Sequence, residues 1–293
     1  MDGVIVVDKA PGWTSHDVVG KMRRIAGTRR IGHLGTLDPM ATGVLPLVID
    51  RATRLAQFFV KNDKVYEGTV RFGFATDTYD AEGEATTEAR PYTATAETIE
   101  PLLERFRGSF AQTPPAVSAK KINGQRAYKL ARQKLPVDLK PVDVTVHELT
   151  LLSCDGPDIR IAVHCSSGTY LRAIAHELGE AAGVGAHLAA LRRLRAGDFS
   201  INHARTLDEL QVLANEGRLA EALIPGADLL PEFPSHVVDR LTEGQIRQGR
   251  DFRTSPFRTP ANARYVKAIT EDGVLLAVGE AQLPNLYHPV MVL

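Results

Sequence analysis

A loop that could do chemistry stands near the start of the chain, where residues 32–46 read GHLGTLDPMATGVLP. Its one carboxylate, Asp38, precedes Pro39, and a residue before proline is disfavoured in the helical region. The glycines of the loop permit sharp turns and the close approach of another chain. A carboxylate held stiffly in this way could work at the floor of a cleft. It could equally cap a turn, because Asp-Pro is a common turn dipeptide; the loop alone leaves both interpretations open.

Other side chains could share a site with Asp38, and each also has an ordinary structural explanation. His33 lies in the same loop, where a single histidine is usually structural. Tyr66 shares one face of a predicted strand with Gly68, Val70 and Phe72, so packing explains it equally well. Arg172 follows Tyr170 at the predicted start of a helix. Its guanidinium could bind a carboxylate or a phosphate, or remain solvated.

Basic residues gather in three segments of a chain whose formal net charge is zero, with 35 basic and 35 acidic residues. Residues 118–140 have one acid, Asp138, against Lys120, Lys121, Arg126, Lys129, Arg132, Lys134 and Lys140. The other two segments contain Arg192, Arg193 and Arg195, and Lys21, Arg23, Arg24, Arg29 and Arg30. Any one cluster is typical of a solvated surface. Three of them in a neutral chain favour a polyanionic partner.

Composition and missing motifs exclude several classes of protein. Two isolated cysteines, Cys154 and Cys165, indicate reduced thiols. We see no signal peptide and no apolar stretch of bilayer length, so we expect a cytoplasmic protein. The 293 residues contain no phosphate-binding loop, no HExxH zinc helix and no GxSxG elbow. We therefore expect neither a cofactor nor a metal ion.

The elements that must position these side chains are predicted from apolar periodicity. Apolar runs and alternating residues indicate strands or buried segments at 3–9, 44–49, 65–72 and 159–165. Helical spacing and capping residues indicate helices after Thr14, at 95–107, from Leu171 to Leu178, from Leu188 to Leu194, and after Thr206. Pro225, Pro231 and Pro234 then mark a break. Short predicted strands follow it, which indicates a small separate β domain from about residue 235.

Several motifs, taken together, resemble those of the TruB family of tRNA pseudouridine synthases. The loop at 32–46 is similar to the catalytic motif of that family. Others follow in order over residues 3 to about 230: DKAPGWTSHDVV at 8–19, DKVYEGTVRFG at 63–73, TDTYDAEG at 76–83, TPPAVSAKKINGQRAYKLAR at 113–132, HCSSGTYLRAIAHELGE at 164–180 and GAHLAALRRLRAGDF at 185–199. So long a series favours a catalytic Asp38 over a turn cap.

The resemblance implies an α+β (mixed α/β) pseudouridine synthase fold, with a mainly antiparallel sheet flanked by helices. Residues 1–234 would form the catalytic domain, with an RNA-binding insertion at about 113–140. Residues 235–293 would form a small β-barrel that is similar to the PUA RNA-binding domain. The enzyme would act as a monomer on the T stem-loop of tRNA, with no obligatory protein partner.

The family's reaction detaches uracil from ribose at tRNA position 55, turns it and reattaches it through carbon, without a cofactor. By resemblance, Asp38 is the catalytic carboxylate; it could attack the sugar, add to the base or remove a ribose proton. Arg172 would keep Asp38 ionised. The base would be flipped out of the RNA. The other implied roles are stacking on uracil for Tyr66, pocket contacts for Tyr170 and Leu191, support of the RNA loop for His33, and RNA binding for Lys120, Lys121, Arg126, Lys129 and Arg132.

Two positions depart from the family pattern. Lys9-Ala10-Pro11-Gly12 has its proline one place later than the usual K-P-x-G, which concerns a local turn. Lys134 follows the Ala-Arg of the insertion, near where a glycine is often found, which concerns the hinge of that segment. Neither departure affects a predicted catalytic position.

Three other functions are weighed against this interpretation. A non-catalytic RNA-binding module has no need of the Asp38, Tyr66 and Arg172 set, because an ionised carboxylate repels phosphate. The related RNA-guided pseudouridine synthase works inside a multiprotein complex, and the insertion at 118–140 favours the stand-alone bacterial type instead. A carboxylate-dependent glycosidase needs two acids of divided role, and the loop at 32–46 has one.

Overall fold

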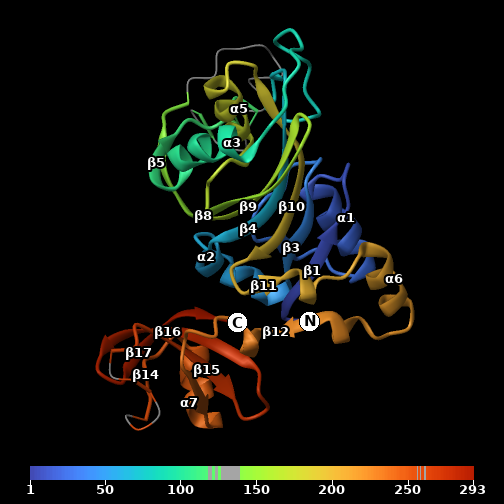
Figure 1. Ribbon diagram of the computed structural model, residues 1–293. Coiled ribbons are helices and arrows are strands. Elements are labelled where there is room, and N and C mark those ends of the chain that lie inside the picture. Colours follow the sequence, from blue (N-terminus) through green and yellow to red (C-terminus); the bar gives the residue numbers. More distant parts are fainter. Residues whose placement is uncertain (118–120, 123–124, 127–138, 256, 258, 261) are drawn as a thin grey trace.

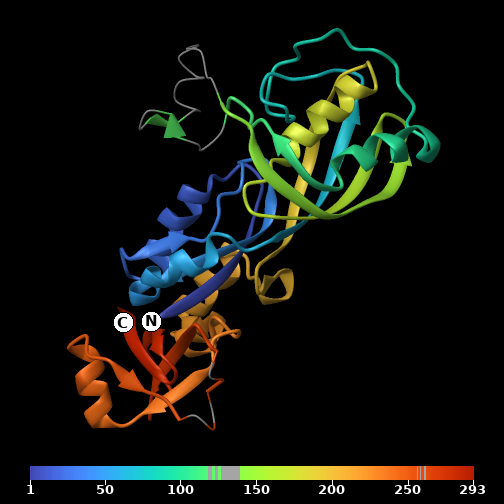
Figure 2. The same ribbon diagram turned by 90° about the vertical axis from the view of Figure 1, so that its left-hand side faces the viewer.

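Figure 1 shows the computed structural model, which describes residues 1–117, 121–122, 125–126, 139–255, 257, 259–260 and 262–293. A large sheet with its helices forms one part of the molecule, and a smaller sheet with helix α7 forms the other. Both termini lie near the junction of the two parts in both views (Figures 1 and 2).

The main sheet has ten strands among the described residues, and it is antiparallel apart from the pairing of β10 with β3. Its order is β12-β1-β3-β10-β4-β9-β8-β5, with β2 on β3 and β11 on β10. The predicted mainly antiparallel sheet is thus confirmed. Its strands are β1 (Gly3–Lys9), β2 (Ile31–His33), β3 (Thr42–Ile49), β4 (Lys64–Phe72), β5 (Gly108–Gln112), β8 (Val142–Asp155), β9 (Asp158–Cys165), β10 (Ala186–Ala196), β11 (Phe199–Ser200) and β12 (Leu223–Pro225).

Helices flank this sheet, and several helices of the chain begin where the sequence places capping residues. Thr14 and Thr206 each form the N-terminal cap of a helix, and each makes a capping box with the acidic residue three positions on. The described α-helices are α1 (Ser15–Ile25), α2 (Ala56–Phe59), α3 (Ala96–Leu103), α5 (Leu171–Ala181), α6 (Leu207–Asn215) and α7 (Arg240–Arg247). Short 3₁₀ helices lie at Asp50–Leu55, Glu104–Phe106, Ile201–His203, Leu219–Ala222 and Gly226–Asp228.

The helix predicted from Leu188 to Leu194 is wrong, because these residues belong to strand β10. Two irregularities of β10 against β4, between Leu188 and Ala190 and between Arg193 and Arg195, shift the register. An extra residue at a β-bulge lets apolar side chains three positions apart reach the same face. Leu188 and Leu191 are therefore both buried, and their spacing imitates that of a helix.

The C-terminal part is a curled sheet, of which five strands are described, in the order β13-β15-β16-β17-β14. Its strands are β13 (Ser235–Val238), β14 (Phe252–Arg253), β15 (Tyr265–Thr270), β16 (Leu275–Leu283) and β17 (Leu286–Val292). In the segment of the insertion, the backbones of β6 (Lys121–Ile122) and β7 (Gln125–Arg126) pair as an antiparallel hairpin.

Apolar side chains join the two parts of the molecule. Val278 and Met291 of the C-terminal sheet belong to the same buried cluster as Val4 of β1 and Val48 of β3. The buried amine of Lys267 donates hydrogen bonds to the carbonyl oxygens of Ala227 and Leu229, both at 2.8 Å. The C-terminal sheet therefore closes one side of the core of the main sheet.

Candidate active site

The loop that carries Asp38 is a tight turn between β2 and β3. The carbonyl oxygen of Asp38 accepts a hydrogen bond from the amide of Ala41 at 3.1 Å, and Pro39 occupies the second position of that turn. The buried hydroxyl of Ser15 bonds to both the amide and the carbonyl of Leu37, at 2.9 and 3.1 Å. The backbone of Asp38 thus forms the turn, which leaves its side chain available for another role.

A buried lysine holds the loop from the side of β1. The amine of Lys9, which is 1% exposed, donates to the carbonyl oxygens of Ala10, Trp13 and Pro39 at 3.0, 2.7 and 3.0 Å. The amide of Gly12 also donates to Pro39 at 2.9 Å, and its φ of +79° is one that glycine adopts readily. The displaced proline of the Lys-Ala-Pro-Gly motif therefore leaves a local turn that contacts the catalytic loop.

A buried arginine holds the loop from the side of β10. The guanidinium of Arg193 donates to the carbonyl oxygens of Val44, Thr36 and Gly35 at 2.6, 3.3 and 3.1 Å. Arg193 is 1% exposed, so the interpretation of its cluster as a solvated surface is wrong at this position. Its neighbour Arg192 is more exposed and forms an ion pair with Asp8 at 2.8 Å.

Arg172 connects Asp38 to a second carboxylate. Its Nε lies 2.9 Å from Asp38 Oδ2, and its Nη2 donates to Asp38 Oδ1 at 3.3 Å. Its Nη1 lies 3.4 Å from Asp80 Oδ2 and donates to the carbonyl of Thr78 at 2.9 Å. Nη2 also donates to the carbonyl of Val117 at 2.9 Å. The guanidinium is therefore held by Thr78, Asp80 and Val117, and it meets Asp38 through one hydrogen bond from Nη2 and an ion-pair contact at Nε.

The two carboxylates differ in their access to solvent. The side chain of Asp38 is 35% exposed, whereas those of Arg172 and Asp80 are 5% exposed. Asp80 also accepts hydrogen bonds from the hydroxyl of Thr78 at 2.6 Å and the amide of Glu82 at 3.1 Å. Asp80 is thus fixed within the protein, and Asp38 is the carboxylate that a substrate can reach.

Opposing charges act on the ionisation of Asp38. Burial raises the pKa of Asp38 above its ordinary value, the neighbouring Arg172 cation lowers it, and the charge of Asp80 raises it again. The net shift is upward. Among the neighbouring cations, Arg172 therefore counteracts burial most strongly, and Lys9 adds to its effect.

Buried apolar and aromatic residues cluster with the loop that carries Asp38. Tyr66 on β4 and Leu191 on β10 are each 9% exposed. They share one buried cluster with Leu37 and Ala41, which flank Asp38 in the loop. Burial raises the pKa of the Tyr66 phenol, and the charge of Asp38 adds to that shift. Tyr66 is therefore a buried, neutral aromatic ring within electrostatic range of Asp38, and its stacking on uracil stays a prediction.

The structure places the other predicted residues around this network to different extents. Tyr170 caps the N-terminus of α5, two positions before Arg172, and its backbone bonds to the side chain of Gln112. His33 ends β2, opposite Leu47 of β3. Lys121 and Arg126 are described by their backbone alone, in the β6–β7 hairpin. Lys120, Lys129 and Arg132 lie outside the described residues.

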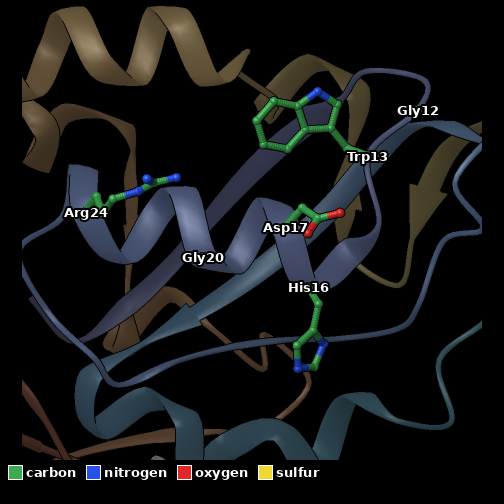
Figure 3. A pocket seen from close by; sticks show the side chains of 6 residues that line it. All are labelled: Gly12, Trp13, His16, Asp17, Gly20 and Arg24. Atoms are coloured by element: carbon green, nitrogen blue, oxygen red, sulfur yellow. The ribbon is translucent and has the colours of Figure 1, made fainter.

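A shallow, open pocket of about 560 Å³ lies against α1 (Figure 3); it is lined by Gly12, Trp13, His16, Asp17, Gly20 and Arg24. Trp13 lies on one side of the helix, and His16 projects from the opposite side. The ring of His16 meets that of His33 edge to face at 6.3 Å. The pocket thus adjoins the histidine that the sequence predicts to support the RNA loop.

Two members of the network went unrecognised in the sequence. Asp80 lies in the TDTYDAEG motif, and the resemblance of this motif to the TruB family was the signal that could have identified it. Arg193 lies in a run of arginines, which indicated a solvated surface. Both side chains bind groups more than 90 residues away in the chain. Local periodicity carries no information about such contacts.

Known proteins are similar to this chain both in sequence and in fold. The sequence models described as "TruB family pseudouridylate synthase (N terminal domain)" and "tRNA pseudouridylate synthase B C-terminal domain" match residues 23–171 and 172–230. The tRNA pseudouridine synthase B of Solibacter usitatus is 59% identical over 293 residues, the whole of both chains. That of Thermobifida fusca is 45% identical over 289 residues, or 95% of this chain and 94% of the other.

Among solved structures, a Cbf5-Nop10-Gar1 complex contains a chain that is 25% identical, with a TM-score of 0.71 over 99% of this chain and 84% of that one. A chain of an H/ACA RNP bound to a substrate RNA has the same TM-score at 23% identity, which shows the fold alone. Fold and site thus define an enzyme of the class that isomerises uridine in RNA. More particularly, the chain belongs to the TruB family of pseudouridylate synthases.

Among the described residues, no helix is both long and apolar enough to cross a membrane.

Proposed function

We propose that the protein converts the uridine at position 55, in the T loop of tRNA, to pseudouridine, with Asp38 as the catalytic carboxylate. One observation supports the role of Asp38 above all: it is the solvent-accessible member of a pair whose cation, Arg172, is buried and lies 2.9 Å away. Two relatives that align along nearly all of this chain are named tRNA pseudouridine synthase B, which supports tRNA as the substrate.

The reaction breaks the bond from ribose C1′ to uracil N1 and forms one from C1′ to C5. A proton is lost from C5 and one is gained at N1, so the product is an isomer and no water is consumed. Ionised Asp38 can assist by attacking C1′, by adding to the ring or by removing a ribose proton. In each case the carboxylate needs a fixed position and a negative charge, and Arg172 supplies both in this proposal.

The target base must leave its stack before Asp38 can reach it, at a cost of a few kcal/mol. We assign Tyr66 to stack on the extruded uracil and Leu191 and Tyr170 to complete its pocket. The apolar cluster that includes Tyr66, Leu191 and Leu37 supports the first two assignments, because uracil needs a surface on which to stack. His33 would hold the part of the RNA loop from which the base has moved.

Affinity for tRNA would come from the RNA backbone and not from the uracil. We assign this role to the insertion at about 113–140, through Lys120, Lys121, Arg126, Lys129 and Arg132, and to the PUA-like residues 235–293. The protein would act as a monomer on the T stem-loop, in the cytoplasm, without a protein partner. Domain 1–234 would carry all the residues that act on the base.

Charge reversal tests whether the insertion binds the RNA backbone. The double variant Lys120→Glu, Lys121→Glu should bind tRNA more weakly and with a flatter dependence on salt, because each lost phosphate contact removes roughly 0.7 to 0.9 from the logarithmic slope. Filter binding at several salt concentrations measures that slope. An unchanged slope would mean that these lysines do not contact phosphate.

Replacing the carboxylate tests the catalytic role. Asp38→Asn keeps the size of the side chain and removes its charge, so pseudouridine formation in a tRNA transcript should fall below detection while binding of the transcript persists. Tritium release from C5 and filter binding measure the two quantities. Normal turnover by this variant would refute the role of Asp38.

An assay that contains only the protein and its RNA substrate distinguishes this function from RNA-guided modification. The pure protein, incubated with an unmodified tRNA T stem-loop and no other protein or RNA, should form pseudouridine at position 55. Mapping by reverse transcription after carbodiimide treatment locates the product. A requirement for a guide RNA would favour the RNA-guided alternative.

A further inference from the structure

Three potential metal ligands that are distant in the sequence meet on the main sheet. They are Asp63, His147 and His164, and their ligand atoms all lie within 4.8 Å of one another. His147 Nε2 is 3.1 Å and His164 Nε2 is 3.7 Å from the same oxygen, Asp63 Oδ2. We propose that these residues form a binding site for a divalent transition-metal ion of the Zn²⁺ type, which fastens three strands of the sheet together.

The sheet brings the three residues together through its register. His164 on β9 lies opposite Val65 of β4, and Asp63 immediately precedes β4. On the other side of β9, the register of β8 shifts between Val146 and Glu148, so His147 is the extra residue of a bulge. A bulge redirects side chains, and the ring of His147 here lies 4.8 Å from that of His164.

The spacing and the donor types suit zinc. Zn²⁺ binds imidazole nitrogen and carboxylate oxygen at about 2.0 to 2.2 Å, so tetrahedral ligand atoms are roughly 3.3 Å apart. The two distances to Asp63 Oδ2, 3.1 and 3.7 Å, bracket that separation. Two imidazoles and one carboxylate favour Zn²⁺ over Mg²⁺, which prefers oxygen ligands and octahedral geometry. Water would fill the remaining position.

The site is accessible and its frame is fixed. The side chains of Asp63, His147 and His164 are 44%, 38% and 25% exposed, so an ion can enter from solvent. The carbonyl of Asp63 accepts a hydrogen bond from the amide of Gly197 at 2.9 Å. Because the ligands come from β8, β9 and the start of β4, a bound ion would tie together the strands that lead to Tyr66. Catalysis itself does not use this ion.

Zinc titration tests the site. The full-length protein, freed of metal with a chelator, should take up one Zn²⁺ per chain in competition with a chromogenic chelator. Co²⁺ should give the visible absorption of a tetrahedral ion, and millimolar Mg²⁺ should not compete. At a hundredfold excess over its dissociation constant, Zn²⁺ should raise the melting temperature by about 5 °C.

Single substitutions locate the ion. Asp63→Asn, His147→Phe and His164→Phe should each weaken Zn²⁺ binding at least about tenfold. His288→Phe is the matched control, since His288 pairs with Asp251 at 2.7 Å and these two belong to no three-ligand group among the described residues. It should bind as the wild type does. Metal-free melting curves verify folding, and the more exposed Asp63 and His147 decide the matter if His164→Phe does not fold.

Three outcomes would overturn the proposal. The first is a wild-type protein that takes up no Zn²⁺ in the titration. The second is equal binding by the three variants and the wild type. The third is binding that is lost in Cys154→Ser and retained in the other variants, because the ion would then sit on a thiol.

Discussion

At the scale of single residues, the carboxylate that a substrate can reach and the residues that hold it in place are different groups. Asp38 is accessible, while the groups that hold it are buried: Arg172 beside its carboxylate, and Lys9 and Arg193 on the carbonyls of its loop. The sequence predicts Asp38 and Arg172, because both lie in recognisable motifs. It does not predict that Arg193 points inward, since a run of arginines has the same composition on a surface and in a buried network.

Asp80 offers a test of this division at the residue scale. Asp80→Asn removes one anchor of Arg172 but keeps its contacts with Thr78, Val117 and Asp38, so the guanidinium stays beside Asp38 and kcat should fall only about tenfold through looser positioning. Its negative charge also helps to raise the pKa of Asp38. Activity is lost as the pH falls through that raised pKa, because Asp38 becomes protonated. The acid limb of kcat against pH should therefore move to lower pH in the variant.

The control for Asp80→Asn is an ion pair of the same kind on the surface. Asp158 accepts two hydrogen bonds from Arg71, both at 2.7 Å, but the side chain of Arg71 is 49% exposed. Asp158→Asn should leave kcat and its pH profile unchanged, because such exposed pairs contribute little. An acid limb of Asp80→Asn that stays in place or moves to higher pH would contradict the charge argument.

At the scale of elements, β4 shows where the sequence-based predictions succeed and β10 shows where they fail. Strand β4 shows clean alternation, and its buried face of Tyr66, Gly68, Val70 and Phe72 is confirmed. Strand β10 has two bulges, so its apolar residues recur with a spacing that favours a helix. Strand β10 also pairs in parallel with β3, and the paired residues are far apart in the chain. Such a pairing leaves no local pattern in the sequence.

The contact between β3 and β10 makes Gly43 sensitive to substitution. Gly43 has a φ of +95°, and an added Cβ would lie 2.2 Å from the carbonyl oxygen of Arg193. Gly43→Ala should lower the free energy of unfolding by roughly 2 to 4 kcal/mol, and it should lower activity because it displaces the end of the Asp38 loop. Urea denaturation and tritium release measure the two effects.

Gly27 provides the matched control for the substitution at Gly43. Its φ is +64°, but a Cβ there would meet nothing within 4 Å. Gly27→Ala should therefore cost about 1 kcal/mol from backbone conformation alone, and it should leave catalysis intact. Equal effects of the two substitutions would mean that the close approach of β10 does not matter.

At the scale of the whole molecule, the C-terminal sheet is joined to the main sheet by a shared core. The sequence predicts the break near residue 235, because prolines and short strands mark it. It does not predict the side chains that cross this boundary. Met291 and Val278 are buried in one cluster with Val4 and Val48, and such pairings between distant strands follow only from the folded arrangement.

The shared core predicts one cooperative unfolding transition for the whole chain. Met291→Ala should cost about 2 to 5 kcal/mol and shift that single transition downward in calorimetry. Val290→Ala, at a position 42% exposed, should shift it little. Two separate transitions, with Met291→Ala moving one of them alone, would contradict a joint core.

The distances along the chain between Asp38 and its supports have a consequence for biosynthesis. The carboxylate meets Arg172 after 134 further residues, and its loop is held by Arg193, which comes later still. A nascent chain that has not yet released β10 from the ribosome therefore has the catalytic loop and Lys9, but it lacks the Arg193 contacts that complete the support of the loop. Such a chain can expose an aspartate but cannot yet rearrange a nucleotide, so translation itself delays the onset of activity.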